Sequence, residues 1–214
     1  TVARYYTPSG RCIQKPYDNT ANLDGRTGGE GGQEKYNQEL TDRFNHGEMI
    51  HADSIHFADS LKVRTKRMER IVYGGGGIMP DFFVPIDTTR YTDYHRNLVA
   101  KGVVIKGVAK YIEKRRKELQ NLYKKFEAFN EKFEIDDEML AGLRTLADNE
   151  KIAFNEEQYS RSLPLIKTQL KAMIARDLWD MNEYFQVMNA TNSSVDQALK
   201  ILNEGKYEET IKAE

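Results

Sequence analysis

The chain has almost no cysteine, little tryptophan and no long apolar run. One cysteine, Cys12, in 214 residues excludes an intramolecular disulfide framework and a thiolate metal cluster, so the fold must rest on apolar burial. No stretch approaches the roughly 18 consecutive apolar residues of a membrane-spanning helix. Residues 1–6 have neither the basic nor the apolar segment of a signal peptide. The net charge of −1 provides no overall field to attract nucleic acid or an anionic membrane.

Glycine and proline are unevenly distributed. Eleven of the 15 glycines and four of the five prolines precede residue 90. Both residues favour turns and interrupt helices. We therefore expect strands and loops before about residue 90 and helices from about residue 91 onward.

Short apolar and β-branched runs define the expected front elements. We expect strands at residues 1–7 and 11–14, joined by a tight turn at Pro8-Ser9-Gly10. A short helix is expected at residues 33–44, one or two strands within 61–73, and another short strand at 81–86. The first residues begin without methionine inside a predicted strand, which suggests a piece of a longer protein.

The second half has apolar residues at helical spacing. Asp136 and Asn155 are expected N-caps. A long helix is expected from Asn155 through an apolar stripe at 163–188, with Pro164 in its first turns or kinking it. The last helix is expected to be capped by Ser193 or Ser194. Other positions expected to face inward are Val104, Val108, Ile112, Leu119, Leu122, Phe126, Phe129, Phe133, Leu140, Leu143, Ala147, Val195, Leu199 and Leu202.

Two segments carry a family resemblance. Residues 3–14 read ARYYTPSGRCIQ, and residues 76–85 read GGIMPDFFVP. The first resembles the strand-turn-strand that follows the catalytic lysine region of carboxyl-terminal processing (tail-specific) serine peptidases of bacteria. The second resembles the later Gly-Ile-x-Pro-Asp-x-x-Val-Pro block of the same family, and the two occur in the family's order.

The resemblance implies a parent protein that hydrolyses peptide bonds near the C-termini of proteins in the periplasm or cell envelope. In that family a serine is activated by a neutral lysine, often with a Gln or Glu partner. Those residues and a substrate-gripping PDZ domain all precede the first segment. The resemblance therefore implies no catalytic residue in this chain, which should be inactive alone. Residues 15–73 are then a long insertion, acting as a lid, a docking element or a subfamily feature.

Several polar residues were weighed as site candidates and none is assigned. Ser9 lies in a turn without a nucleophile elbow. Ser60 and Lys62 lie two residues apart in an expected strand, and we interpret them as a fortuitous pair. His46, His51 and His56 recur every five residues, with Glu48 and Asp53 among them, but two zinc ligands on a helix are spaced by four.

Other candidate patterns also have structural explanations. The basic run at residues 114–117, followed by Lys124 and Lys125, favours a solvated or salt-bridged helix surface because acidic residues follow it closely. The glycine runs lack the Lys-Ser/Thr of a phosphate-binding loop. We therefore expect no metal, no cofactor and no nucleic-acid partner.

These observations predict an α+β chain. Residues 1–88 supply the C-terminal strands of a peptidase β-core, with the insertion at about 15–73, and residues 91–214 form an all-helical C-terminal domain. The partners expected are peptide substrates of the parent, and an adaptor or a second copy bound through the helices. The alternative is a non-enzymatic helical protein-interaction module, recognisable by an exposed apolar stripe along residues 163–188.

Overall fold

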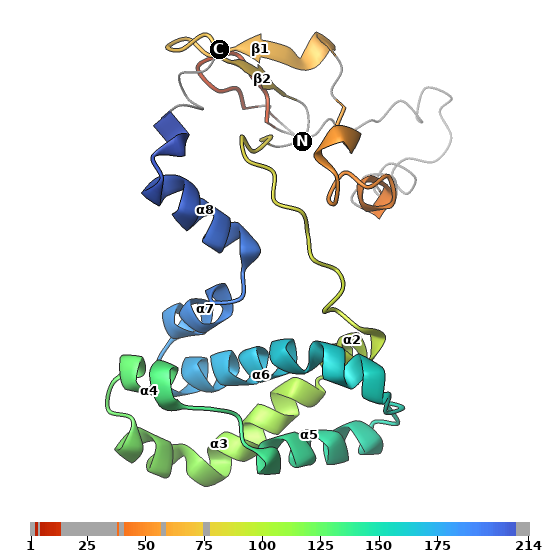
Figure 1. Ribbon diagram of the computed structural model, residues 1–214, viewed down its shortest axis with the longest axis vertical. Coiled ribbons are helices and arrows are strands. Elements are labelled where there is room, and N and C mark those ends of the chain that lie inside the picture. Colours follow the sequence, from red (N-terminus) through yellow and green to blue (C-terminus); the bar gives the residue numbers. More distant parts are fainter. Residues whose placement is uncertain are drawn as a thin grey trace. The chain divides into compact units, whose positions relative to one another are not determined.

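The computed structural model of the chain describes residue 3, residues 5–13, residue 38 and residues 41–56, 59–74 and 78–208 (Figure 1). Of these residues, 61% are helical, and a small antiparallel sheet accompanies them, so the chain is α+β at this coarse level. It divides into two compact units. The first comprises residues 1–86 and 197–214, and the second comprises residues 87–196.

The first unit contains short elements. The 3-10 helices η2 (Ala52–Ser54) and η3 (Asp59–Leu61) precede an antiparallel pair, β1 (Lys62–Arg64) and β2 (Ile71–Tyr73). The side chain of Thr65 accepts a hydrogen bond from the Arg70 N–H at 3.1 Å, which closes the connection between the strands. The two strands expected within residues 61–73 are thus confirmed.

The tight turn predicted at Pro8-Ser9-Gly10 is also present. The Gly10 N–H donates to the Thr7 carbonyl at 2.8 Å, and the Thr7 N–H donates to the Arg11 carbonyl at 2.9 Å. Gly10 has φ +83°, which a residue without Cβ adopts at little cost. In the described part, however, the expected strands are reduced to a single bridge between Tyr6 and Cys12. Residues 1, 2, 4 and 14 of this prediction lie outside the described residues.

The strand predicted at residues 81–86 is wrong. The segment has a bend and then irregular backbone. Proline lacks the N–H that a strand donates, and both Pro80 and Pro85 lie in or beside this segment. The Ile86 N–H donates to the Met49 carbonyl instead. Of the helix expected at 33–44, residues 38 and 41–44 are helical, and the other positions lie outside the described residues.

The second unit is helical. It contains α2 (Asp93–Ala100), α3 (Val103–Leu122), α4 (Phe126–Lys132), α5 (Asp137–Asn149), α6 (Glu156–Leu178) and α7 (Met181–Asn189), and α8 (Ser193–Asn203) begins in it. Helix α6 packs against α2, α3 and α7, and α3 packs against α5 (Figure 1).

Two of the three predicted helix starts are confirmed. The side chain of Asp136 accepts from the Met139 N–H at 2.8 Å, and that of Asn155 accepts from the Gln158 N–H at 2.9 Å. The predicted cap of the last helix is wrong by one residue. The Asn192 side chain accepts from the Ser194 N–H at 3.0 Å, so Asn192 fills the role expected of a serine.

The expected long helix is interrupted near its C-terminal end. It ends at Leu178, and α7 starts at Met181. Asp180 caps α7 by accepting from the Met181 N–H at 2.5 Å. Pro164 lies inside α6, more than two turns from its start, and the helix continues past it. Of the two alternatives expected for Pro164, a place in the first turns or a kink, the residue lies in the third turn, and the kink stays a prediction.

An aromatic cluster forms the centre of the second unit. Phe129 is fully buried and stacks on Phe133 with ring centroids 4.6 Å apart. Tyr123 meets Phe129 edge-on at 5.5 Å. Trp179 lies 5.2 Å from Phe129 and 5.8 Å from Phe126. The cluster joins the ends of α3 and α6 to α4, and it fixes Trp179 at the point where α6 stops.

Some residues expected inside the protein are exposed. Leu122 is 65% exposed, because α3 ends there and Tyr123 and Phe126 occupy the core instead. Leu199 and Leu202 are 54% and 58% exposed, whereas Ile201 is buried. The apolar stripe of α6 is mostly covered, through Leu165, Ile166, Leu170, Met173 and Ile174.

The aromatic cluster gives a stability prediction. Phe129→Ala should lower the free energy of unfolding by about 3–5 kcal/mol, because it removes a fully buried ring and leaves a cavity. The matched variant Phe185→Ala, at a ring that is 53% exposed, should change it by less than about 0.5 kcal/mol. Urea denaturation followed by the fluorescence of the single tryptophan measures both. Equal losses in the two variants would contradict this description of the core.

Candidate functional site

The first segment that resembles the peptidase family lies against the end of β2 in the first unit. A Cβ placed on Gly74 would lie 3.0 Å from the Cys12 carbonyl oxygen and 3.4 Å from Arg11 Cγ. A 3.0 Å contact is tighter than nine in ten real Cβ contacts, and the neighbouring atom belongs to the backbone, so a side chain at this position would force the Cys12 backbone to shift. The end of β2 therefore lies against the bridge that follows the Pro8-Ser9-Gly10 turn. Arg70, just before β2, also pairs with Asp81 in the second segment.

The serines considered from the sequence have local structural partners or no base beside them. Ser9 Oγ lies 2.9 Å from Thr7 Oγ1 inside the turn. Ser60 lies in η3 and Lys62 begins β1, so they do not share a strand as the sequence analysis assumed.

The histidine-rich segment has other interactions. Glu48 accepts a hydrogen bond from Arg43 Nε at 2.7 Å, and His56 Nδ1 lies 3.0 Å from the Ser54 carbonyl. Within the described residues, no group of three or more His, Cys, Asp or Glu could hold a metal ion. In the same part of the chain, no helix has the length and apolar character needed to span a membrane.

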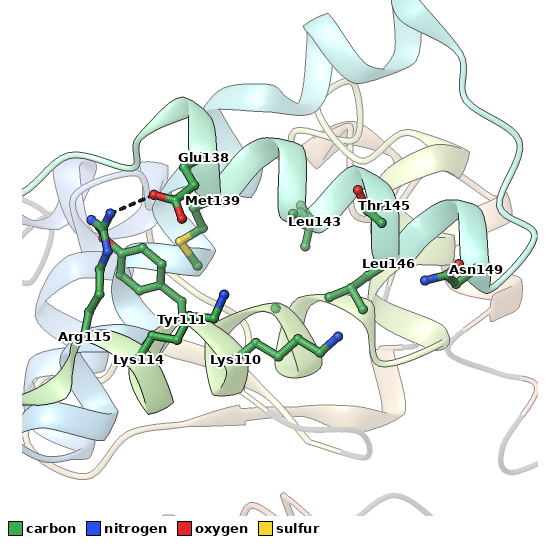
Figure 2. A pocket seen from close by; sticks show the side chains of 12 residues that line it. Lys110, Tyr111, Lys114, Arg115, Glu138, Met139, Leu143, Thr145, Leu146 and Asn149 are labelled. Carbon is green, nitrogen blue, oxygen red and sulfur yellow. Dashed lines mark hydrogen bonds and ion pairs between the residues drawn. The ribbon is translucent and has the colours of Figure 1, made fainter.

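A groove lies between α3 and α5 in the second unit. It has a volume of about 290 Å³ (Figure 2). Apolar side chains from both helices line the groove. Tyr111 comes from α3, and Met139, Leu143 and Leu146 come from α5. Figure 2 shows Tyr111 and Met139 pointing toward one another and Leu146 pointing toward α3.

Charged side chains line the α3 wall of the groove. Arg115 donates to Glu138 at 2.7 Å and to Asp136 at 3.2 Å, and its guanidinium lies 5.2 Å from the centre of the Tyr111 ring. By contrast, Lys110 and Lys114 have no hydrogen bond or ion pair with any residue that the structure describes. The groove thus has two unpaired cations, while its acidic residue, Glu138, is already neutralised.

Tyr111 stays neutral in this groove. Burial raises the pKa of its phenol above the ordinary value, and the nearby Asp136 carboxylate raises it further. The Arg115 hydrogen bond to the phenol oxygen, at 3.4 Å, acts in the opposite direction. Tyr111 therefore contributes a ring face and a hydroxyl group, and no negative charge, at neutral pH.

Two glycines shape the groove. A Cβ at Gly107 would lie 3.1 Å from Leu143 Cδ1, so Gly107 allows α3 to approach α5 closely. A Cβ at Gly142 would meet nothing within 4 Å, so its position faces open space in the groove. The sequence patterns did not predict this groove. Its one available signal was a glycine inside each of two otherwise regular helical patterns, which often has a packing or functional reason.

A second cavity, of about 490 Å³, lies where α6 and α7 meet the segment that follows α4. Lys171 donates to the Asn130 carbonyl at 2.7 Å, and burial lowers the pKa of its ammonium group. Lys171 already has this carbonyl partner, whereas Lys110 and Lys114 in the groove have no partner among the described residues. We therefore regard this cavity as a weaker candidate than the groove.

A buried polar cluster between α2 and α6 is structural. Ser162 is fully buried and donates to the Gln158 carbonyl at 2.7 Å. Thr92 caps α2 and lies 3.2 Å from Ser162 Oγ, while His95 Nε2 lies 3.0 Å from Gln169 Oε1. Apart from His95 Nδ1, which is buried without a partner among the described residues, these side chains hydrogen-bond in the interior, and the burial of Ser162 makes it inaccessible as a nucleophile.

Two residues of the basic run at 114–117 form salt bridges. Arg115 pairs with acidic residues at the start of α5, and Arg116 pairs with Asp177 of α6 at 2.8 Å. The interpretation of this run as a helix surface that forms salt bridges is confirmed for both arginines.

Comparison with known proteins gives one match. Residues 94–180 match a family of unknown function (DUF8443). This range runs from α2 to the residue after Trp179, so it contains the aromatic cluster and the whole groove. No curated protein and no solved structure matches the chain.

The glycines give a second prediction. Gly142→Leu should leave stability unchanged or raise it by up to about 1 kcal/mol, because leucine favours the helix and enters open space. Gly107→Leu should lower stability by about 1–3 kcal/mol, because its side chain must displace Leu143. Urea midpoints of the two variants give the comparison. A destabilised Gly142→Leu with an unaffected Gly107→Leu would contradict the described packing of α3 on α5.

Proposed function

We propose that the chain is part of a serine-type carboxyl-terminal processing endopeptidase of the bacterial periplasm or cell envelope. Its parent hydrolyses peptide bonds near the C-termini of proteins. The observation that carries this proposal is the approach of Gly74 to the Cys12 carbonyl. This approach places the end of β2 against the first family-like segment. The chain then continues from β2 toward the second family-like segment.

The described geometry supports an architectural role for these segments. The described glycines and prolines of these segments lie in a turn and in an irregular connection, and Gly74 between the segments makes a close backbone approach. None of these residues carries a reactive group. A serine-lysine dyad needs a serine within hydrogen-bond reach of a lysine whose pKa burial has lowered. In the resembling family this dyad precedes the first segment. We therefore assign no catalytic residue to this chain and expect it to be inactive alone.

Proteolysis by the chain and by its full-length parent tests the proposal directly. Each is incubated with the same unfolded protein substrate, and products are identified by mass spectrometry. Cleavage should require the parent and should begin near the C-terminus of the substrate. Cleavage by the chain alone, or none by a folded parent, would overturn the proposal.

Ser9 provides a sharper test within the full-length parent. Ser9→Ala should keep proteolysis within about two-fold of the unsubstituted protein, because its hydroxyl group serves the turn and a neutral surface change has little effect. Gly74→Val should reduce proteolysis at least about ten-fold by forcing the end of β2 away from the first segment. Initial rates on the same substrate measure both. Loss of activity in Ser9→Ala would instead point to a nucleophile in the turn.

A second candidate function is favoured by the groove. We infer that residues 91–214 act as a helical protein-interaction module, either in place of the proteolytic role or beside it. The part of the stripe that lies in α6 is mostly buried, whereas Met181 and Phe185 in α7 are 47% and 53% exposed. Only the α7 end of the stripe therefore provides the exposed apolar surface that this alternative expects. The groove between α3 and α5 supplies another surface, with apolar and cationic groups at one site.

A further inference from the structure

We infer that the groove between α3 and α5 binds a short acidic peptide segment that carries large apolar side chains. This inference rests on the interaction role proposed for the helical part and is independent of proteolysis. It names the chemistry of the partner and the surface that receives it.

The apolar part of the groove provides the contact area. Met139 and Leu143 are buried below it, and Leu146 and Tyr111 are partly buried at its sides. A leucine or phenylalanine side chain entering the groove would remove apolar surface of both partners from water. Gly142 leaves the middle of the α5 wall without a side chain, so the entering group has room.

Charge determines which peptide fits. Lys110 and Lys114 lie one helical turn apart on the same wall, and both lack a partner within the described residues. The other cations nearby are occupied. Lys106 pairs with Glu150 at 2.6 Å, and Arg115 pairs with Glu138 and Asp136. An acidic peptide would complete the two remaining pairs, whereas a basic peptide would meet two like charges.

The dimensions favour a short segment. The α3 wall runs from Gly107 to Arg115, which corresponds to about 12 Å at the rise of an α-helix. About four residues of extended peptide cover this length. In an extended segment that alternates apolar and acidic residues, the apolar side chains enter the groove. The acidic side chains reach Lys110 and Lys114 at the edge of the groove. The groove is open along its length, so it does not enclose a long alkyl chain.

Fluorescence anisotropy with the complete chain tests the inference. The probe is a fluorescein-labelled peptide, Gly-Glu-Leu-Glu-Phe-Glu-Leu-Glu. Two control peptides replace all glutamates by lysine or all apolar residues by serine. Only the first peptide should bind, and its affinity should fall as salt rises from about 0.05 M to about 0.5 M, since salt screens exposed charges.

Two independent pairs of variants locate the binding. Gly142→Leu fills the groove, and Ala141→Leu adds the same side chain to the neighbouring exposed position of α5. Lys110→Glu/Lys114→Glu reverses the free cations, and Lys117→Glu/Lys132→Glu makes the same charge change outside the groove. Gly142→Leu and Lys110→Glu/Lys114→Glu should each raise Kd at least about ten-fold, while the controls stay within about two-fold. Trp179 unfolding curves verify that each variant is folded.

Several outcomes would overturn the inference. Peptide binding that Gly142→Leu leaves unchanged would place the peptide elsewhere, while the general interaction role would stand. No binding by the folded chain would reject the acidic peptide as a partner. Displacement of the peptide by sodium dodecanoate, with dodecanoate binding more tightly, would identify the site as one for anionic amphiphiles. A self-association that Gly142→Leu abolishes would identify a second copy as the occupant.

Discussion

The helical unit depends on the burial of Phe129. Its ring stacks on Phe133 and lies against Tyr123 and Trp179, so one side chain holds together the end of α3, the short α4 and the end of α6. Helix α4 is too short to be stable by itself in water, and its position depends on these contacts. With α3 and α6 joined in this way, the remaining face of α3 is available to α5.

The groove follows from how α3 meets α5. Gly107 permits close approach at one point, where Leu143 packs against the glycine backbone. Gly142 of α5 provides no side chain to fill the space, and Tyr111 and Met139 point toward one another near Arg115. Two glycines with different surroundings therefore produce a tight contact and an adjacent cavity on the same helix pair. The apolar and charged groups of the groove are held by regular helices, so their positions are preorganised.

The sequence was most informative where a local interaction decides the structure. The caps at Asp136 and Asn155 and the turn at Pro8-Ser9-Gly10 each depend on groups a few residues apart, and all three are present. It was least informative where tertiary contacts decide. Apolar periodicity alone did not reveal that Trp179 packs on the aromatic cluster and ends α6, or that Leu122 is left outside. The groove was not predicted for the same reason. The shape of a cavity between two packed helices depends on where a glycine leaves a position without a side chain.

The central claim is that a rigid aromatic core supports an open, cationic groove between α3 and α5. A ¹H–¹⁵N NMR titration of the complete chain with the acidic peptide tests it most directly. The account predicts chemical-shift changes concentrated in residues 107–115 and 138–149, with the Trp179 indole resonance unmoved. Changes centred on α6 and α7, or a Trp179 resonance that shifts with the peptide, would contradict it.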